Sequence, residues 1–211
     1  MALDLEEQEQ VDALKAWWKQ YGNIAVAVAV LFTVAVGAYR GWEWYSAKQT
    51  QEAAALFDTL RQQLASNDPK RLRDLAGQVI DKYPRTVYAV DAAMIAAKAN
   101  FDSGDVKSAK AQYQWVVDHA KQPQSRDLAR LRLASVMLDE KALDEAWKLA
   151  NAAHVAAFDP LYNDLKGDVL SLQGKAVEAR SAYQAALDKL PKESAFRGYV
   201  QIKLDALGEQ G

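Results

Sequence analysis

The stretch 160-PLYNDLKGDVLSLQGKAVEARSAYQAALDKLP-191 carries the strongest fold signal in the chain, because it has the spacing of a pair of short helices. Small residues at positions 8, 20 and 27 of this stretch would let two helices approach closely, and a large residue at position 24 would fill the gap to the next pair. A glycine at position 15 suits a tight turn, and a proline at position 32 ends the second helix. The pattern consists of Gly167, Leu170, Gly174, Ala179, Tyr183, Ala186 and Pro191.

Two upstream segments have related spacing, one starting near Val90 and one near Asp127. All three resemble the tetratricopeptide repeat, a helical hairpin of about 34 residues. The aligned alanines Ala109, Ala146 and Ala179 lie 37 and 33 residues apart, which indicates a degenerate array with longer linkers. The upstream matches are Ala97, Gly104, Ala109, Tyr113 and Val116, then Leu133, Ala134, Met137, Ala146 and Ala153, with Lys141 and Ala142 where a glycine turn is usual.

Further helices are predicted on both sides of the three repeats. Residues 53–64 and 72–83 have the layout of a hairpin, with a turn at 67–69 and Pro84 at its end. At the other end, Phe196, Val200, Leu204 and Leu207 form one apolar stripe of a last helix that would cap the array, with Lys192, Glu193 and Arg197 outward. The sequence therefore predicts an all-α protein in which an α-solenoid of about four hairpins ends in a capping helix.

A single transmembrane helix is predicted at residues 21–39, because no charged residue occurs between Lys19 and Arg40. Nineteen helical residues span about 28 Å, close to the thickness of the hydrocarbon layer. A buried soluble helix and a cleaved signal peptide are the alternatives, but the preceding twenty residues are acidic rather than short and basic. Aromatic residues flank the span as membrane-interface anchors: Trp17, Trp18, Tyr21, Tyr39, Trp42, Trp44 and Tyr45.

The charge distribution bears on partners and orientation. Five acidic residues and two lysines give residues 1–20 a charge of −3, whereas residues 40–211 carry 24 basic and 23 acidic side chains. A balanced domain of this kind has no long-range attraction for nucleic acid, so nucleic-acid binding is not expected. Lys15 and Lys19 on one side of the span match Arg40 and Lys48 on the other, and the positive-inside count does not choose an orientation.

No catalytic or metal-binding motif is found. The chain has no cysteine, and His119 and His154, both expected in second helices of repeats, lie in no ligand-spaced cluster. Asp164 and Asp168 share a helix face as paired carboxylates do, although a solvated charged face is the more common arrangement. We therefore predict no enzyme, no cofactor and no metal, and an enzyme with an unrecognised site is the less favoured alternative.

Stacked hairpins offer instead a concave surface lined by the first helix of each pair. Exposed apolar residues there would bind a peptide or helix, unless the N-terminal pair or the capping helix packs over them. On the repeat alignment, positions 2, 5, 9 and 12 point into this surface: Asp91, Met94, Lys98, Phe101, Leu128, Leu131, Ser135, Leu138, Leu161, Asp164, Asp168 and Ser171.

Taken together, these segments resemble the YfgM family of ancillary SecYEG translocon subunits along the whole chain. The similarity is carried by the N-terminal motif at 9–22 followed directly by a span, and by 41–45, 131–134, 165–168 and 174–183. The combination of motif, span and repeats is specific, whereas the repeats alone would be generic. The family has no established catalytic residues, and none is carried over.

The resemblance implies a topology and a set of partners. It implies an inner-membrane protein with a cytoplasmic segment at 1–20, a transmembrane helix at 21–39 and a periplasmic domain at 40–211. The implied partners are the SecYEG translocon, the periplasmic chaperone PpiD, translocating polypeptides and the lipid bilayer. A signalling tether, whose acidic N-terminal segment docks a cytoplasmic stress-response regulator, is the alternative function.

Overall fold

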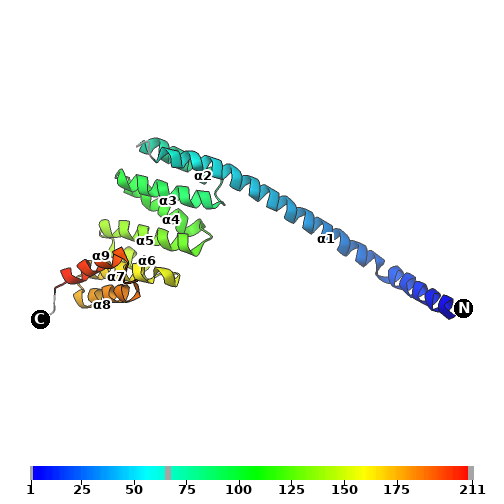
Figure 1. The fold of residues 1–211 in the computed structure, drawn as a ribbon. Coiled ribbons are helices and arrows are strands. Elements are labelled where there is room, and N and C mark those ends of the chain that lie inside the picture. Colours follow the sequence, from blue (N-terminus) through cyan, green and yellow to red (C-terminus); the bar gives the residue numbers. More distant parts are fainter. Residues whose placement is uncertain (1, 65–67, 209–211) are drawn as a thin grey trace. The chain divides into compact units, whose positions relative to one another are not determined.

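The computed structural model describes residues 2–64 and 68–208, and the described chain is α-helical with no strand (Figure 1). This confirms the prediction of an all-α protein. The chain divides into two units, residues 1–51 and 52–211, and each is described by itself.

The first unit is formed by most of helix α1 (Ala2–Gln63). This helix is long and apolar enough to cross a membrane by length and composition, with a window of mean hydropathy 1.9. Between Val11 and Tyr45 its large apolar and aromatic side chains, including those of Leu31 and Phe32, are exposed. We predicted a separate helix at 53–64, whereas the structure continues α1 without a break through Gln63.

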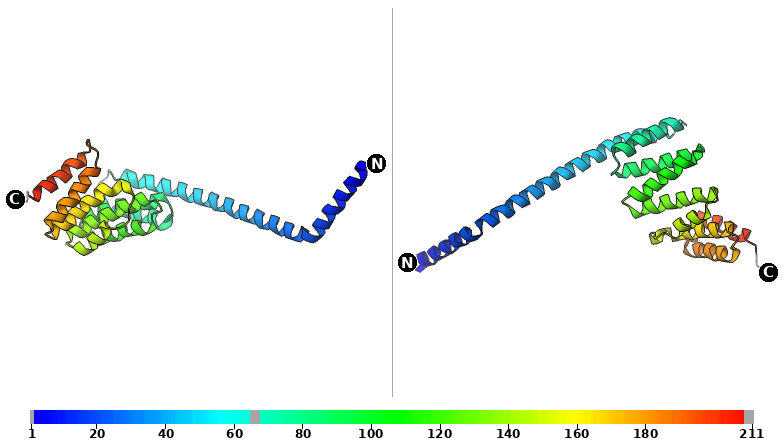
Figure 2. Two further views of the ribbon diagram at one scale, coloured as in Figure 1. Left: turned by 90° about the horizontal axis from the view of Figure 1, so that it is seen from below. Right: turned by 180° about the vertical axis from the view of Figure 1, so that it is seen from behind.

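The second unit is a stack of helical hairpins. The end of α1 and α2 form the first hairpin, three further hairpins follow, and a last helix ends the array, as the sequence predicts. Figure 1 and the right view of Figure 2 show the helices from α2 to α8 stacked in chain order. Their bounds are α2 (Pro69–Lys82), α3 (Val87–Asp102), α4 (Val106–His119), α5 (Pro123–Asp139), α6 (Leu143–Ala150), the 3₁₀ helix η1 (Ala156–Phe158), α7 (Asp159–Leu172), α8 (Ala176–Lys189) and α9 (Ala195–Ala206).

Small residues form the contacts inside each hairpin, as the repeat pattern requires. Alanines or a glycine occupy position 8, and alanines position 20, of the three aligned repeats, and all of them are buried. The large residues at position 24, Tyr113 and Tyr183, are buried as well. The buried small residues are Ala97, Ala134 and Gly167 on the first helices and Ala109, Ala146 and Ala179 on the second.

The three repeat turns share one backbone geometry. Gly104 and Gly174 have φ of 82° and 76°, in the left-handed region that glycine adopts without a steric penalty. Lys141 takes the same conformation with φ of 61°, although it carries a side chain. In each turn the residue after the left-handed one donates its backbone N–H to the carbonyl five residues earlier, as Ala142 does to Met137 at 2.8 Å. The substitution of lysine for glycine therefore leaves the turn intact but strained.

The third hairpin departs from the repeat, because α6 has only eight residues. His154 was predicted in this second helix, which is wrong: it lies in the segment between α6 and η1. Its ring stacks on Tyr162 with centroids 3.7 Å apart, and its Nε2 lies 3.1 Å from Asp159 Oδ1. Asp127, only 2% exposed, accepts hydrogen bonds from Arg130 and from the amide of Val155. A buried polar network thus replaces the missing helical turns.

The last helix is confirmed as a helix that covers the end of the array. Val200 and Leu204 are buried against the α8 core. Arg197 was predicted to point outward, but its guanidinium donates to the carbonyls of Leu187 and Leu190 at the end of α8. The prediction failed there because an arginine near a helix C-terminus satisfies carbonyls that have no partner inside the helix.

Candidate functional site

The first helices of the last two repeats, together with α9, enclose a cavity of about 380 Å³, which we name the C-terminal groove. Six of its lining residues were predicted from the repeat alignment, and five were missed. The predicted ones are Leu128, Leu131, Ser135, Leu161, Asp164 and Asp168. The missed ones are Arg132, Leu165, Phe196, Tyr199 and Lys203.

The capping helix α9 lines one side of this groove and does not fill it. Phe196, Tyr199 and Lys203 repeat on α9 the spacing of three and then four residues that Leu128, Leu131 and Ser135 have on α5, and that Leu161, Asp164 and Asp168 have on α7. The sequence did contain this signal. It was missed because the stripe through Val200 and Leu204 was taken as the whole role of the helix.

An ion-pair cluster joins α9 to the groove floor. Lys203 Nζ lies 2.9 Å from both carboxylate oxygens of Asp164 and 2.7 Å from Asp168 Oδ2, and the Tyr183 hydroxyl donates to Asp168 Oδ1 at 2.8 Å. Burial, with the neighbouring charge of Asp168, raises the pKa of Asp164 to about 6 although Lys203 opposes the shift. Burial lowers the pKa of Lys203, but its two carboxylate partners outweigh burial and keep that pKa above its usual value.

An aromatic side chain stands at the rim of the groove. Tyr199 is 55% exposed, yet its ring is held between two neighbours. The ring centroid of Phe196 lies 5.7 Å away, and Lys203 Nζ lies 4.5 Å above the Tyr199 ring. These two contacts restrain the orientation of the exposed ring.

A second, more open cavity of about 700 Å³, the N-terminal groove, lies over α3 and the first hairpin. It contains the predicted residues Met94 and Lys98 together with Leu64, Leu72 and Ile95. The other four predicted groove residues line neither groove. Of these, Asp91 and Phe101 are exposed, whereas Leu138 and Ser171 are partly buried.

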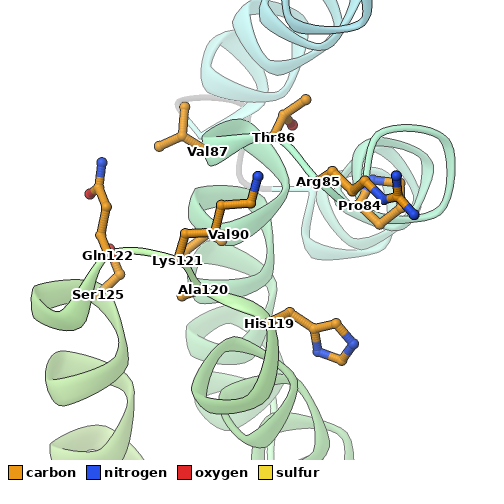
Figure 3. A pocket seen from close by; sticks show the side chains of 10 residues that line it. All are labelled: Pro84, Arg85, Thr86, Val87, Val90, His119, Ala120, Lys121, Gln122 and Ser125. Carbon is orange, nitrogen blue, oxygen red and sulfur yellow. The ribbon is translucent and has the colours of Figure 1, made fainter. Parts of the chain in front are cut away.

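A smaller cavity of about 120 Å³ lies at the opposite ends of these helices, between the α2–α3 and α4–α5 loops (Figure 3). Arg85, His119 and Lys121 line it, and Figure 3 shows Gln122 and Ser125 at the start of α5 on one side. His119 is held against its own helix, with Nδ1 2.8 Å from the Trp115 carbonyl and its ring stacked on Trp115. This cavity assembles no reactive group.

Metal-binding chemistry has no basis in the described part of the chain, since residues 2–64 and 68–208 contain no cluster of three or more possible metal ligands. The polar network around Asp127 and His154 is fully engaged in holding α5, α7 and the linker between them. The geometry of the described residues therefore defines a helical-repeat protein with one long apolar helix and two grooves along its first helices.

Comparison with known proteins agrees with this class. The family model of the tetratricopeptide repeat-like domain matches residues 15–209. A relative named "Ancillary SecYEG translocon subunit" from Neisseria gonorrhoeae is 32% identical over 98% of this chain and 100% of its own length. Proteins of the same name from Haemophilus influenzae and Escherichia coli are each 25% identical, over 88% and 95% of this chain and 91% and 96% of their own lengths.

The chain belongs to the family of ancillary SecYEG translocon subunits, the YfgM family that its sequence resembles. Family membership also confirms the prediction that the protein is not an enzyme, because this tetratricopeptide repeat-like family has a scaffold role.

Proposed function

We propose that the protein is a membrane-anchored scaffold that associates with the SecYEG translocon and helps to pass or shield proteins that leave the channel. The observation that carries the proposal is a single long apolar helix followed by stacked hairpins whose first helices leave grooves, in a chain whose relatives carry the name of a translocon subunit.

The anchor supplies the mechanism. A groove held beside the channel exit meets each emerging segment at a high effective concentration, so weak binding is sufficient. Apolar groove residues such as Leu128, Leu131 and Met94 suit segments that have not yet buried their own apolar side chains. The periplasmic chaperone PpiD is the proposed recipient of these segments.

The proposed topology places residues 1–20 in the cytoplasm, 21–39 in the inner membrane and 40–211 in the periplasm. The exposed apolar surface of α1 supports a lipid environment, and its flanking aromatic residues, of which Trp17 and Trp18 on one side and Trp42 and Trp44 on the other are exposed, suit the two interfaces. The chain has no cysteine, so single introduced cysteines report the side directly. Glu178→Cys should react with a membrane-impermeant maleimide in intact spheroplasts and Glu9→Cys only after lysis; the reverse pattern refutes this topology.

Site-directed photo-crosslinking in native inner membranes tests the partners. Crosslinkers at Met94 and Leu131, in the two grooves, should capture SecYEG subunits, PpiD or nascent chains. Val177 on α8 is a matched control, because it is an exposed apolar residue outside both grooves. Equal capture from Val177, or no capture of any of these partners from the groove positions, counts against the proposal.

The acidic charge of residues 1–20 favours a second candidate, a tether that docks a cytoplasmic regulator. Deleting residues 2–14 separates the two functions. A translocon accessory should keep its crosslinks after the deletion, whereas a signalling tether should lose its regulatory output.

A further inference from the structure

We propose that a proton controls the docking of α9: a proton held by the carboxylate pair of Asp164 and Asp168 keeps this helix on the array, and loss of the proton favours its release from the C-terminal groove. This control of docking holds or fails independently of the scaffold function, because it concerns how one side of the groove forms. The charges that α9 and α7 bring together are the basis for it.

The carboxylate pair faces too little positive charge. Asp164 and Asp168 lie one turn apart on α7, and Lys203 pairs with both, at 2.9 Å and 2.7 Å. The side chains of Asp164 and Lys203 are only 10% and 17% exposed, so solvent screens this cluster poorly. Arg132 of α5 also lines the groove, but it is exposed and forms no ion pair with either carboxylate within residues 68–208. With both carboxylates ionised, the largely buried cluster therefore carries one uncompensated negative charge.

A proton removes this excess charge. Burial, together with the charge of Asp168, raises the pKa of Asp164 from 3.8 to about 6, against the opposing effect of Lys203. With Asp164 protonated, Lys203 and Asp168 remain as a balanced pair, and the Tyr183 hydroxyl donates to the other oxygen of Asp168 at 2.8 Å. The docked position of α9 is thus best matched by a cluster that holds one proton.

The titratable and charged groups that face Asp164 from other helices are Lys203 and Tyr199 of α9, Tyr183 of α8 and Arg132 of α5. Although burial lowers it, the pKa of Lys203 is kept above its usual value by the two carboxylates, and burial raises the pKa of Tyr183. Neither group therefore exchanges a proton between pH 5 and 7. Among the described residues, α6 and η1 contribute none to the groove lining. The proton is accordingly assigned to the carboxylate pair.

The helix α9 is the last one of the described array and is held from one side. Val200 and Leu204 pack against the core of α8, whereas the outer face of the helix stays open, with Ile202 69% exposed. Elements at the edge of a stacked array have fewer neighbours and open locally at a lower free energy than those in its middle. When α9 opens, water reaches Asp164, and the pKa of this carboxyl returns towards 3.8.

The direction of the effect follows from this difference in pKa. The docked state raises the pKa of Asp164, so it binds the proton more tightly than the open state does. Acid therefore favours docking, and this advantage is lost as the pH rises through about 6. For pKa values of 3.8 and about 6, the ratio of docked to open α9 falls about tenfold between pH 5 and 7. A simple salt bridge, which weakens when its carboxylate is protonated, predicts the opposite sign.

The consequence is a groove whose lining depends on pH. In mild acid the groove is complete. As the pH rises, α9 leaves more often and takes Phe196, Tyr199 and Lys203 out of the lining.

Amide hydrogen exchange, followed by mass spectrometry on the full chain in lipid nanodiscs, measures the docking of α9. Rates at pH 5, 6 and 7 are corrected for the intrinsic pH dependence of exchange, which leaves the protection that the structure provides. Protection of residues 195–206 should fall about tenfold from pH 5 to pH 7. Protection of α2, which packs against α3 in the first repeats, should change less than about twofold.

Three substitutions assign the effect to the carboxylate pair. Asp164→Asn cannot ionise at this position and should leave the protection of α9 nearly independent of pH. Lys203→Met leaves two carboxylates without their ammonium, so α9 should lose protection at pH 7 and the fall with pH should steepen. Asp205→Asn is the matched control, because it removes an exposed carboxylate of α9 itself, which accepts a hydrogen bond from Gln201, and it should keep the tenfold fall.

The proposal is overturned if the protection of α9 stays constant or rises with pH in the wild-type chain. It is also overturned if Asp164→Asn keeps the full fall, if Lys203→Met flattens the fall, or if Asp205→Asn abolishes it. An equal fall in α2 refutes it as well, because the proton would then act on the whole fold and not on the docking of α9.

Discussion

Substituting Gly167 by alanine tests the packing of the last hairpin most directly. Gly167 lies in the middle of α7, where a Cβ would overlap Cδ1 and Cε1 of Tyr183 and stand only 2.8 Å from its Cζ. Carbon atoms pack at about 3.5–4.0 Å, so the ring would have to retreat. Tyr183 is 3% exposed and its hydroxyl is bonded to Asp168, which leaves the ring no free space.

The expected cost combines three effects. Overpacking a core costs about 1–3 kcal/mol, and weakening the tyrosine hydrogen bond adds about 1 kcal/mol. Replacing glycine by alanine in a helix returns about 1 kcal/mol. The net loss is therefore about 1–3 kcal/mol, which corresponds to a fall in Tm of roughly 2–12 °C for a domain of this size. Circular dichroism at increasing temperature measures it in the full chain, and hydrogen exchange should localise the loss to α7 and α8.

Gly198→Ala is the matched control. Gly198 is also in a helix, but a Cβ there would meet nothing within 4 Å, so this change should raise the stability by up to about 1 kcal/mol. If Gly167→Ala is as stable as the wild-type protein, the close packing of Tyr183 on α7 is refuted. If both variants lose stability equally, a steric clash between the new Cβ and Tyr183 does not explain the loss.

The remaining predictions concern the linker network, the groove floor, the strained turn and the anchor. Asp127→Ala should lower the free energy of unfolding by about 2–4 kcal/mol, measured by urea denaturation, because it leaves the Arg130 charge without its carboxylate. The pKa of Asp164, raised to about 6, means that this carboxyl stabilises the fold below about pH 4 and loses that contribution as the pH rises through 6. Asp164→Asn should therefore reduce the fall in stability between about pH 4 and 7 by roughly 1–3 kcal/mol, in denaturation midpoints across that range. Lys141→Gly should add about 1 kcal/mol in thermal unfolding, because glycine adopts a φ of 61° without strain. A double Val30→Asp and Val34→Asp variant should be released by carbonate washing, because each central charge costs about 3 kcal/mol in a membrane.

Each of these has a control and a contrary outcome. Asp144→Ala removes an exposed carboxylate and should change stability by less than about 0.5 kcal/mol, so an equal loss would contradict a special role of Asp127. An unchanged pH dependence in Asp164→Asn contradicts the raised pKa. A destabilised Lys141→Gly would mean that the lysine side chain contributes more than the turn strain costs. Val30→Leu should remain in the carbonate pellet, and release of this variant too would argue against a lipid-embedded helix.

Local spacing was sufficient to predict the helices and their pairing. Residues such as Ala97, Ala109 and Tyr113 recur at fixed intervals because each hairpin solves the same packing problem, and the structure buries all of them. The apolar run of α1 was equally plain, since it has no polar face. The repeat that starts near Asp127 has the weakest sequence signal of the three, and it is also the hairpin whose second helix, α6, is shortest.

Contacts between residues far apart in sequence could not be predicted in the same way. Lys203 reaches Asp164 from 39 residues away, and Asp127 reaches the amide of Val155 from 28. Nothing in their local spacing distinguishes these side chains from a solvated charged face. The interpretation of Asp164 and Asp168 as a solvated pair was therefore wrong, because their burial depends on the placement of α9.

The architecture separates the residues that stabilise the array from those free to bind. Position 8 of a first helix faces its own hairpin, as Gly167 faces Tyr183, while Asp164 and Asp168, three residues before and one after it, face the groove. In a stacked array each hairpin contacts only its neighbours, so a change at position 8 is felt within one or two repeats. A change at an exposed groove residue such as Tyr199 removes only its ring contacts with Phe196 and Lys203, and should alter binding more than stability. Lys203 belongs to both classes of residue, because its ammonium pairs with the groove carboxylates and also attaches α9 to the array. A substitution of Lys203 should therefore change both binding and stability.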